Sequence, residues 1–433
     1  MVTSPIRQGV RLRHPSAGPI LRISAATAMF RFTVKGVVSM SLELVNLVRE
    51  LIRIESPSGH EGAVSRFCRD WMNRHGFDKT AVDDYGSVTG IIQGDPTGRT
   101  ILLDGHLDTV EPGDLSRWSR DPFGGELIDG RIHGRGTSDM KGAFGAMMLA
   151  ASRFAPQRSR LKGNIVVTGS AWEEFFEGYA LGKIIERLTR EGLRPGLVII
   201  GEASNLTLKI GQRGRAEIVV RTLGKSVHAS NPHLGVNAVY SMQAVIEDLR
   251  ALEPRDDPLL GKGIYEVTDI ISSPYPGASV VPAACRITVD RRLLSGETEE
   301  SVLAPLRDMV KRRKNMDPQF EAEVFIETGS LTRTDGKTED VKRFFPAWKL
   351  EPDNAVVKLG TQALQTVGLP GQVGYYAFCT NGSYSAGIAK IPTLGFGPSQ
   401  EHLAHVADEY IAVSDLEKAC EGYQALIRAY LMD

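Results

Sequence analysis

The pair His106 and Asp108 has the residue types and spacing of a metal site. It follows a hydrophobic segment, residues 101–103, at the point where the sequence turns polar. On an extended backbone, side chains two positions apart project to the same side, so His106 and Asp108 can share one site. A carboxylate beside an imidazole can accept the second ring N–H and fix which nitrogen faces a metal. A glycine-rich turn then delivers Asp139, and we interpret these three residues as the base of a metal site.

Two more acidic clusters come directly after hydrophobic segments. Glu173 and Glu174 follow residues 165–170, and Glu202 follows residues 197–200. Neighbouring side chains diverge, so one glutamate of the pair can bind a metal while the other acts on the metal's water. A glutamate pair is usually a solvated charge pair, but its place after a buried strand favours the functional interpretation. The last candidate ligands lie near the C-terminus: Glu401, His402 and His405.

These residues need strands and helices to position them, and the hydrophobic pattern supplies both in alternation. We predict strands and helices over these ranges: 87–92, 100–103, 164–168 and 197–200 as strands, 143–154 and 178–190 as helices. Such alternation is typical of an α/β fold, in which helices cover both faces of a sheet. The polar clusters lie at strand ends, where such sheets place their sites. A capping box from Ser58 to Glu61 predicts one further helix.

The pattern changes after Gly211. We predict a small α+β unit in β-α-β-α-β order, with elements at 216–221, 235–252, 287–290, 299–312 and 320–326. A helix at 354–366 then resumes the first pattern. The chain is therefore predicted to have a metal-binding catalytic domain, residues 41–211 and 336–433, and an inserted domain, residues 212–335.

Composition and charge are those of an ordinary globular protein. The 433 residues are 42% hydrophobic and 24% charged, which permits a sizeable core. A net charge of −1 gives no electrostatic case for binding nucleic acid or an anionic membrane surface. No hydrophobic segment has the length that spans a bilayer. The four cysteines show no CxxC spacing, so we expect no disulfide framework and a cytoplasmic location.

Residues 1–40 differ from the rest of the chain. No acidic residue precedes Glu43, whereas basic residues recur: Arg7, Arg11, Arg13, Arg22, Arg31 and Lys35. This composition is similar to that of an organelle transit peptide. The alternative, which we favour, is a disordered leader or a misassigned start, with the true start at Met40. In each case we expect the segment to lie outside the fold.

Five segments in this order resemble one enzyme family. They are GHLDTV (105–110), GRGTSDMKG (134–142), the glutamate pair, Gly201-Glu202 and AHVADEY (404–410). The family is that of the metallopeptidases and deacylases, which includes acetylornithine deacetylase, succinyl-diaminopimelate desuccinylase, aminoacylase and carboxypeptidase G. The resemblance runs from about Met40 to the C-terminus. Four more segments are similar to its selenium-metabolism-linked hydrolases: LLGKG (259–263), DRRLLSGET (290–298), FFPAWK (344–349) and FCTNGS (378–383).

The resemblance implies a zinc-exopeptidase-like catalytic domain, a mixed sheet with helices on both faces, and an inserted α+β domain that acts as lid and dimerisation domain. It also implies a site for two divalent metal ions. One ion would be held by His106, Asp139 and Glu202. The other would be held by Glu174, His405 and the same Asp139. A carboxylate with two oxygens can bridge two cations in this way.

The remaining roles at the site follow from the same resemblance. Asp108 would orient His106, and Glu173 would be the general base that takes a proton from the attacking water. We expect zinc because the ligands are mixed nitrogen and oxygen, although such ligands also bind Co or Mn. We also expect a cis peptide bond between Asp139 and Met140, as in relatives.

Three further choices depend on the family pattern. His405, which follows an alanine and precedes Glu409 and Tyr410, matches the ligand position, and His402 does not. Many relatives have an asparagine that binds the reacting carbonyl where this chain has Ser279. They often have an aspartate where this chain has Asn381, which we expect to contact the substrate.

Two residues of the inserted domain are predicted to reach a substrate. Arg292 lies where relatives use an arginine to hold a carboxylate, which a guanidinium matches bidentately. The alternative is a surface ion pair, for which Arg291 is the better candidate. His228 matches a segment in which two lids pair and each lends this histidine to its neighbour, although a lone histidine is more often structural. We therefore expect a homodimer in which His228 stabilises the oxyanion.

These features predict a metal-dependent amidohydrolase that cleaves an N-acyl amino acid or a small peptide-like substrate. One alternative is a di- or tripeptidase. Another is a non-catalytic member of the fold that binds a ligand or partner. Non-catalytic members usually lose ligands, and here every ligand position is filled, which favours the enzyme. We expect a small-molecule amide as its partner and neither nucleic acid nor membrane.

Overall fold

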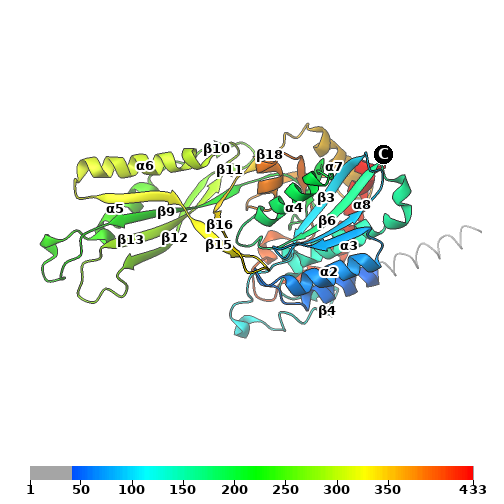
Figure 1. The fold of residues 1–433 in the computed structure, drawn as a ribbon, viewed down its shortest axis with the longest axis horizontal. Coiled ribbons are helices and arrows are strands. Elements are labelled where there is room, and N and C mark those ends of the chain that lie inside the picture. The colour runs from blue at the N-terminus through cyan, green and yellow to red at the C-terminus, as the bar shows by residue number, and fades with distance from the viewer. Residues whose placement is uncertain (1–40, 433) are drawn as a thin grey trace, which may run out of the picture. The chain divides into compact units, whose positions relative to one another are not determined.

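Two large β-sheets organise residues 41–432, the part of the chain that the computed structural model describes (Figure 1). The leader predicted at residues 1–40 lies outside the described residues. The part of the chain that the structure describes begins with a helix over residues 41–52. None of the helices in residues 41–432 combines the length and apolar character that crossing a membrane requires.

The first sheet is mixed and has nine strands in the order β1-β2-β6-β3-β7-β20-β8-β18, with β19 paired to β8. β3 pairs in parallel with β6 and with β7, whereas β2 pairs with β6 in antiparallel fashion. Its strands are β1 (Lys79–Val82), β2 (Val88–Ile92), β3 (Arg99–His106), β6 (Gly163–Ser170), β7 (Leu197–Ile200), β8 (Leu208–Gln212), β18 (Trp348–Lys349), β19 (Val373–Tyr376) and β20 (Thr393–Gly395). The side-by-side parallel strands β6, β3 and β7 therefore end at one edge.

Helices cover both faces of this sheet, which confirms the predicted α/β class. On one face, α4 (Tyr179–Arg190) packs its leucines and isoleucines against Leu102, Val166 and Val198. Successive side chains of a strand point to opposite faces. The intervening residues therefore face α3 (Gly142–Ser152) and α8 (Val413–Leu431), which contact β3 and β6. Two more helices flank the sheet: α2 (Gly62–Arg74) and α7 (Ala355–Gln365).

The second sheet is antiparallel, in the order β12-β13-β9-β14, with β17 paired to β9. Its strands are β9 (Gly214–Leu223), β12 (Ile264–Ser273), β13 (Ala284–Leu293), β14 (Glu321–Ile326) and β17 (Phe344–Phe345). One face packs against α5 (Ala238–Arg250) and α6 (Glu299–Met316) around a hydrophobic core. The predicted β-α-β-α-β order omitted β12, whose side chains are mostly exposed. We call residues 214–345 the lid.

A hairpin of the lid contacts the catalytic part of the chain. It consists of β15 (Thr328–Thr332) and β16 (Thr338–Lys342), and the predicted boundary at residue 335 falls in its turn. Glu339 accepts hydrogen bonds from the hydroxyls of Tyr85 (3.0 Å) and Tyr179 (2.7 Å). Hydrophobic side chains of the hairpin pack against Phe176. After β17 the chain returns to the first sheet at β18, so the lid ends later than predicted.

Candidate metal centre

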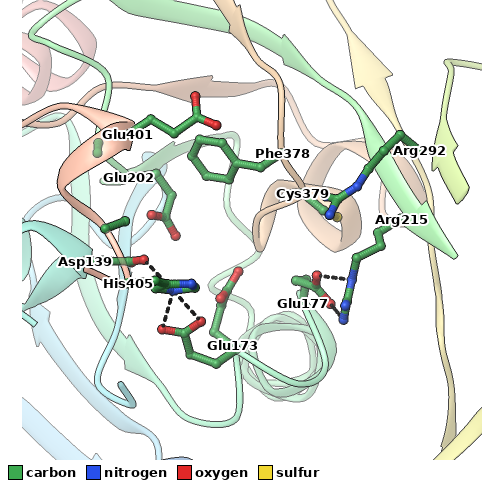
Figure 2. A pocket seen from close by; sticks show the side chains of 13 residues that line it. Asp139, Glu173, Glu177, Glu202, Arg215, Arg292, Phe378, Cys379, Glu401 and His405 are labelled. Atoms are coloured by element: carbon green, nitrogen blue, oxygen red, sulfur yellow. Dashed lines mark hydrogen bonds and ion pairs between the residues drawn. The ribbon is translucent and has the colours of Figure 1, made fainter. Parts of the chain in front are cut away.

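The five predicted ligands come together at one edge of the first sheet. Figure 2 shows three of them, Asp139, Glu202 and His405. His106 is the last residue of β3, and the loops after β6 and β7 carry Glu174 and Glu202. Asp139 lies in the short helical turn η2 (Thr137–Lys141). His405 lies in the loop after η6 (Glu401–Leu403). The ligands meet because adjacent parallel strands end together.

Asp139 lies between the two histidines. Its Oδ1 is 2.9 Å from Nε2 of His106, and its Oδ2 is 3.0 Å from Nε2 of His405. His405 Nε2 also lies 3.1 Å from Oε2 of Glu174, and His106 Nε2 lies 3.6 Å from Oε1 of Glu202. The expected cis peptide bond follows Asp139. Each oxygen of Asp139 thus faces a different group of ligands.

The tautomer of His106 suits a metal ligand. Its Nδ1 lies 2.9 Å from the backbone carbonyl of Asp108. Because a carbonyl oxygen can only accept a hydrogen bond, Nδ1 carries the proton. Although burial lowers the pKa of His106, the hydrogen bond to Asp139 raises it well above its ordinary value, so Nε2 carries a proton as well; when that proton leaves, Nε2 has a lone pair that a metal can bind.

The charges of the site are unbalanced within the described residues. The ion pairs of Asp139, Glu174 and Glu202 there are all with histidines, not with lysine or arginine. Burial, reinforced by the Asp139 charge, raises the pKa of Glu202 to about 8. Hydrogen bonds to Asp139 and Glu174 raise the pKa of His405 to about 10. The histidine protons thus supply positive charge that these carboxylates require.

Glu173 is aimed at the same site without being held there. Its side chain is buried, and within the described residues its Oε1 has no hydrogen-bond partner. Burial raises the pKa of Glu173 well above its ordinary value. An unpaired buried carboxylate oxygen beside clustered carboxylates and two histidines fits a centre of divalent cations, which prefer such oxygen and nitrogen donors.

Asp108 has a different task from the one predicted. Its carboxylate Oδ1 lies 3.7 Å from His106 Nδ1, which bonds the carbonyl of the same residue instead. The two carboxylate oxygens accept the backbone N–H groups of Glu173 (3.1 Å) and Glu174 (3.0 Å). Asp108 also accepts the hydroxyl of Ser58 at 2.7 Å. The carboxylate of Asp108 therefore orients the glutamate pair, and its backbone carbonyl orients His106. The prediction failed because β3 ends at His106, so the spacing rule for extended strands does not hold for Asp108.

The predicted capping box is also wrong. Glu61 is the N-cap of α2, but its carboxylate does not cap the helix. It accepts the backbone N–H groups of Gly59 (2.9 Å) and Trp172 (3.0 Å). Trp172 has a left-handed backbone, with φ of 62°. A left-handed conformation costs energy in residues other than glycine. The hydrogen bond from the N–H of Trp172 to the buried Glu61 stabilises this conformation in the residue directly before Glu173.

Four of the five ligands, Asp139, Glu174, Glu202 and His405, line a cavity of about 350 Å³ that residues of the lid also line. The rest of the lining consists of Glu173 and of these residues: Glu177, Ala203, Arg215, Arg292, Phe378, Cys379, Glu401 and Ala404. Two of them were named from the sequence, Glu401 as a candidate ligand and Arg292 as a candidate for binding a substrate carboxylate. Phe378 and Cys379 lie in the FCTNGS segment, which was singled out from the sequence. Glu177 lies four residues after Glu173 and was not predicted. Arg215 had no signal in the sequence, because strand β9 brings it from the lid.

The other predicted residues lie in different places. Arg292 lines the cavity and forms an ion pair with Asp290 at 2.7 Å. Arg291, expected at the surface, is buried and pairs with Glu297 at 2.6 Å. His228 is exposed in the loop after β9 and is not part of the cavity lining of its own chain.

Asn381 does not line the cavity. Its amide nitrogen donates to Asp104 (2.8 Å) and Ser170 (2.7 Å), and its oxygen accepts the N–H of Gly178 (2.6 Å). The side chain is buried with its polar atoms bonded inside the protein. These contacts do not support the predicted contact with substrate. Asn381 instead links the strand end at Ser170 to the start of α4.

Comparison with known proteins gives a consistent result. The model of peptidase family M20/M25/M40 matches residues 102–429. The chain is 33% identical to protein YgeY of Escherichia coli (strain K12), over 90% of this chain and 94% of that one. It is 26% identical to succinyl-diaminopimelate desuccinylase of Cereibacter sphaeroides (strain ATCC 17025 / ATH 2.4.3), over 90% and 100%.

The solved structures are similar in fold. An M20 family metallo-carboxypeptidase, Sso-CP2 from Sulfolobus solfataricus, superposes with a TM-score of 0.70 at 18% identity, over 90% of this chain and 99% of that one. The resemblance to selenium-metabolism-linked hydrolases stays a prediction.

Proposed function

Since this chain belongs to peptidase family M20/M25/M40 and is a metal-dependent hydrolase of amide bonds, we propose that it cleaves an N-acyl amino acid or a small peptide-like substrate with Glu173 as general base. The observation that carries the proposal is the position of Asp139, with one carboxylate oxygen toward each histidine. Such an arrangement suits a carboxylate that bridges two cations.

The ligands divide into two groups that share Asp139. His106 and Glu202 would complete one site, and Glu174 and His405 the other. When bound, the two cations would polarise the amide carbonyl and lower the pKa of the attacking water. Zinc is our first choice for both, with Co or Mn as alternatives that the same donors accept.

Glu173 has the position that proton transfer requires. Glu173 lines the same cavity as four of the ligands, and within the described residues its Oε1 has no hydrogen-bond partner, so the carboxylate can take a proton from the attacking water and return it to the leaving amine. Its raised pKa brings the carboxyl closer to the range where it can both accept and donate a proton. Asp108 keeps the backbone of Glu173 in place during this transfer.

Arg292 would fix the orientation of the substrate. It brings a guanidinium from the lid to the cavity, where a carboxylate of the substrate could bind. A substrate so held places its amide between Arg292 and the ligands. This favours molecules with a carboxylate near the scissile amide, as in N-acyl amino acids and short peptides.

We also propose that the enzyme is a homodimer in which His228 of one protomer stabilises the oxyanion in the other. His228 is exposed and does not line its own chain's cavity, so a role at the reacting carbonyl requires a second protomer. The exposed edge strand β12 offers backbone groups for pairing.

The four cysteines are buried thiols rather than disulfides, which supports a reducing, cytoplasmic location.

The test is a metal analysis joined to a substrate panel. The purified protein is stripped with a chelator, reloaded separately with Zn²⁺, Co²⁺ or Mn²⁺, and assayed on N-acyl amino acids and on di- and tripeptides. Each substrate is paired with its C-terminal amide, which lacks the carboxylate. We expect two ions per chain and hydrolysis that depends on them. Two bound ions without hydrolysis of any member would favour the non-catalytic, ligand-binding alternative.

A further inference from the structure

Glu409 is a fully buried carboxylate that is not one of the ligands. It lies directly before β21 (Tyr410–Ala412), in the same segment as His405, and it does not line the cavity. Its Oε1 accepts the backbone N–H groups of Ser138 (2.7 Å) and Asp139 (3.1 Å). Its Oε2 accepts from the guanidinium of Arg135 (2.6 Å) and from the N–H of Gly136 (3.1 Å).

These bonds make Glu409 the anchor of the turn that carries Asp139. A charged carboxylate is costly to bury unless hydrogen bonds and a countercharge satisfy it. Here three of the donors are backbone groups of residues 136–139, so the carboxylate fixes the path of the chain and not merely a side chain. Gly136 has φ of 84°, the left-handed conformation that turns these N–H groups toward Glu409.

The position of Asp139 depends directly on this turn. Its own N–H is one of the donors to Glu409, and its two carboxylate oxygens lie 2.9 and 3.0 Å from the two histidines. A small movement of the Asp139 backbone would lengthen both contacts. The segment that supplies Glu409 also supplies His405, so one loop carries a ligand and the anchor of its neighbour.

We propose that Glu409 is a positioning residue that sets the bridging carboxylate of Asp139 between the two metal sites through the backbone of residues 136–139. The inference rests on the proposed two-metal function. Because both metal sites share Asp139, loss of Glu409 weakens the binding of both ions together. Loss of a ligand that only one site uses weakens mainly the binding of that one ion. Removing a group that orients a metal ligand typically lowers metal affinity about 10–100-fold.

The test measures binding of Co²⁺ to the stripped full-length protein. Two dissociation constants are obtained by competition with a chromophoric chelator, together with the visible absorption of bound Co²⁺. Glu409→Gln removes the charge and places an amide N–H₂ against backbone donors. We expect both constants to rise at least about tenfold and the Co²⁺ spectrum to change. Glu421→Gln, the same change at an exposed position of α8, is the control and keeps wild-type constants.

Two more variants separate positioning from general stability. Arg135→Gln removes the buried ion pair but leaves the carboxylate to accept the N–H groups, so it lowers the melting temperature with a much smaller effect on Co²⁺ binding. Glu409→Asp keeps the charge on a shorter side chain and recovers part of the affinity lost in Glu409→Gln. Far-UV circular dichroism shows whether each variant is folded. If Glu409→Gln does not fold, the constants of folded Glu409→Asp decide.

If folded Glu409→Gln has the wild-type dissociation constants for Co²⁺, or binds only one of the two ions more weakly, the proposal is wrong. If Glu409→Gln does not fold, wild-type dissociation constants in folded Glu409→Asp would overturn the proposal instead. An equal loss of affinity in Arg135→Gln and Glu409→Gln would assign Glu409 a purely structural role. Failure of the proposed function looks different, because the wild-type protein itself would then fail to bind two Co²⁺ ions.

Discussion

Arg215 and Glu177 form a half-buried ion pair that joins the lid to the catalytic part of the chain, with Nε 2.7 Å from Oε1 and Nη2 donating to Oε2 at 3.1 Å (Figure 2). Arg215 also pairs with Glu217 at 3.1 Å. Two carboxylates therefore neutralise this guanidinium, although it lines the cavity. Arg292 is the other arginine of the lining and has Asp290 as its acidic partner. These pairings make Arg292 the better candidate for a substrate carboxylate.

We therefore predict that Arg292→Lys raises KM for substrates with a carboxylate near the amide by about 10–100-fold, because a lysine cannot replace a guanidinium that binds in two-point fashion. KM for the matching C-terminal amides should change little. Steady-state kinetics on both members of each pair measures the effect. Equal KM changes for acids and amides would show that Arg292 does not bind the carboxylate.

The two neighbouring glutamates should respond differently to the same change. Glu173→Gln should keep both metals and lose about 10²–10⁴-fold in kcat, because it removes only the proton acceptor. Glu174→Gln should lower occupancy of one ion, because it removes a ligand that contacts His405. Metal content by elemental analysis and kcat are measured on both variants. Equal metal loss in both would mean that the roles are wrongly assigned.

Catalysis across a dimer predicts complementation between two inactive proteins. His228→Ala and Glu173→Gln damage different parts of the site, so a mixed dimer contains one site with both residues intact. Mixing the variants under conditions that exchange subunits should restore activity, to at most half that of the wild-type protein. The unmixed variants are the controls. No recovery despite proven exchange, or a fully active monomer, would rule out the role of His228 in a neighbour.

Glu61 should make stability depend on pH. Burial, with a further contribution from the Asp108 charge, raises the pKa of Glu61 from 4.5 to about 8. Between these values the folded protein keeps a proton that the unfolded chain releases, so this group lowers the free energy of unfolding as pH rises from 4.5 to 8. Glu61→Gln removes that dependence.

Urea unfolding at pH 5 and pH 8, with chelator present, measures this pH dependence. Between these pH values the free energy of unfolding should fall by roughly 1–4 kcal/mol more in the wild-type protein than in Glu61→Gln. Glu421→Gln, at an exposed position, should follow the wild-type protein. Parallel curves for wild type and Glu61→Gln would show that Glu61 does not hold this proton.

The sequence was sufficient for the central strands β3, β6 and β7 and for the polar residues that follow them. The hydrophobic run before His106 and the one before Glu173 specify strands β3 and β6, and their parallel pairing brings the two polar ends together. The contact between Asp108 and the Glu173 backbone was not predictable in this way. Spacing rules hold within a strand, and Asp108 lies beyond the end of β3.

The remaining differences depend on contacts between distant segments. Arg215 reaches the cavity only because β9 continues from β8, and nothing in its immediate sequence marks it. Glu61 has the spacing of a capping box, but its carboxylate instead bonds the N–H of Trp172 in another loop. Strand β12 was missed because its exposed side chains weaken the hydrophobic pattern.

The hairpin β15–β16 decides how the cavity can open. The lid joins the first sheet through two crossings that lie side by side, since Phe345 pairs with Arg215 and Trp348 pairs with Gln212. Two adjacent crossings form a hinge about which a lid can rotate. The hairpin is a third attachment, bonded through Glu339 to Tyr85 and Tyr179. Rotation of the lid about this hinge therefore has to break those hydrogen bonds as well as the Arg215–Glu177 ion pair, so two tyrosine hydroxyls help to hold the lid beside the metal centre.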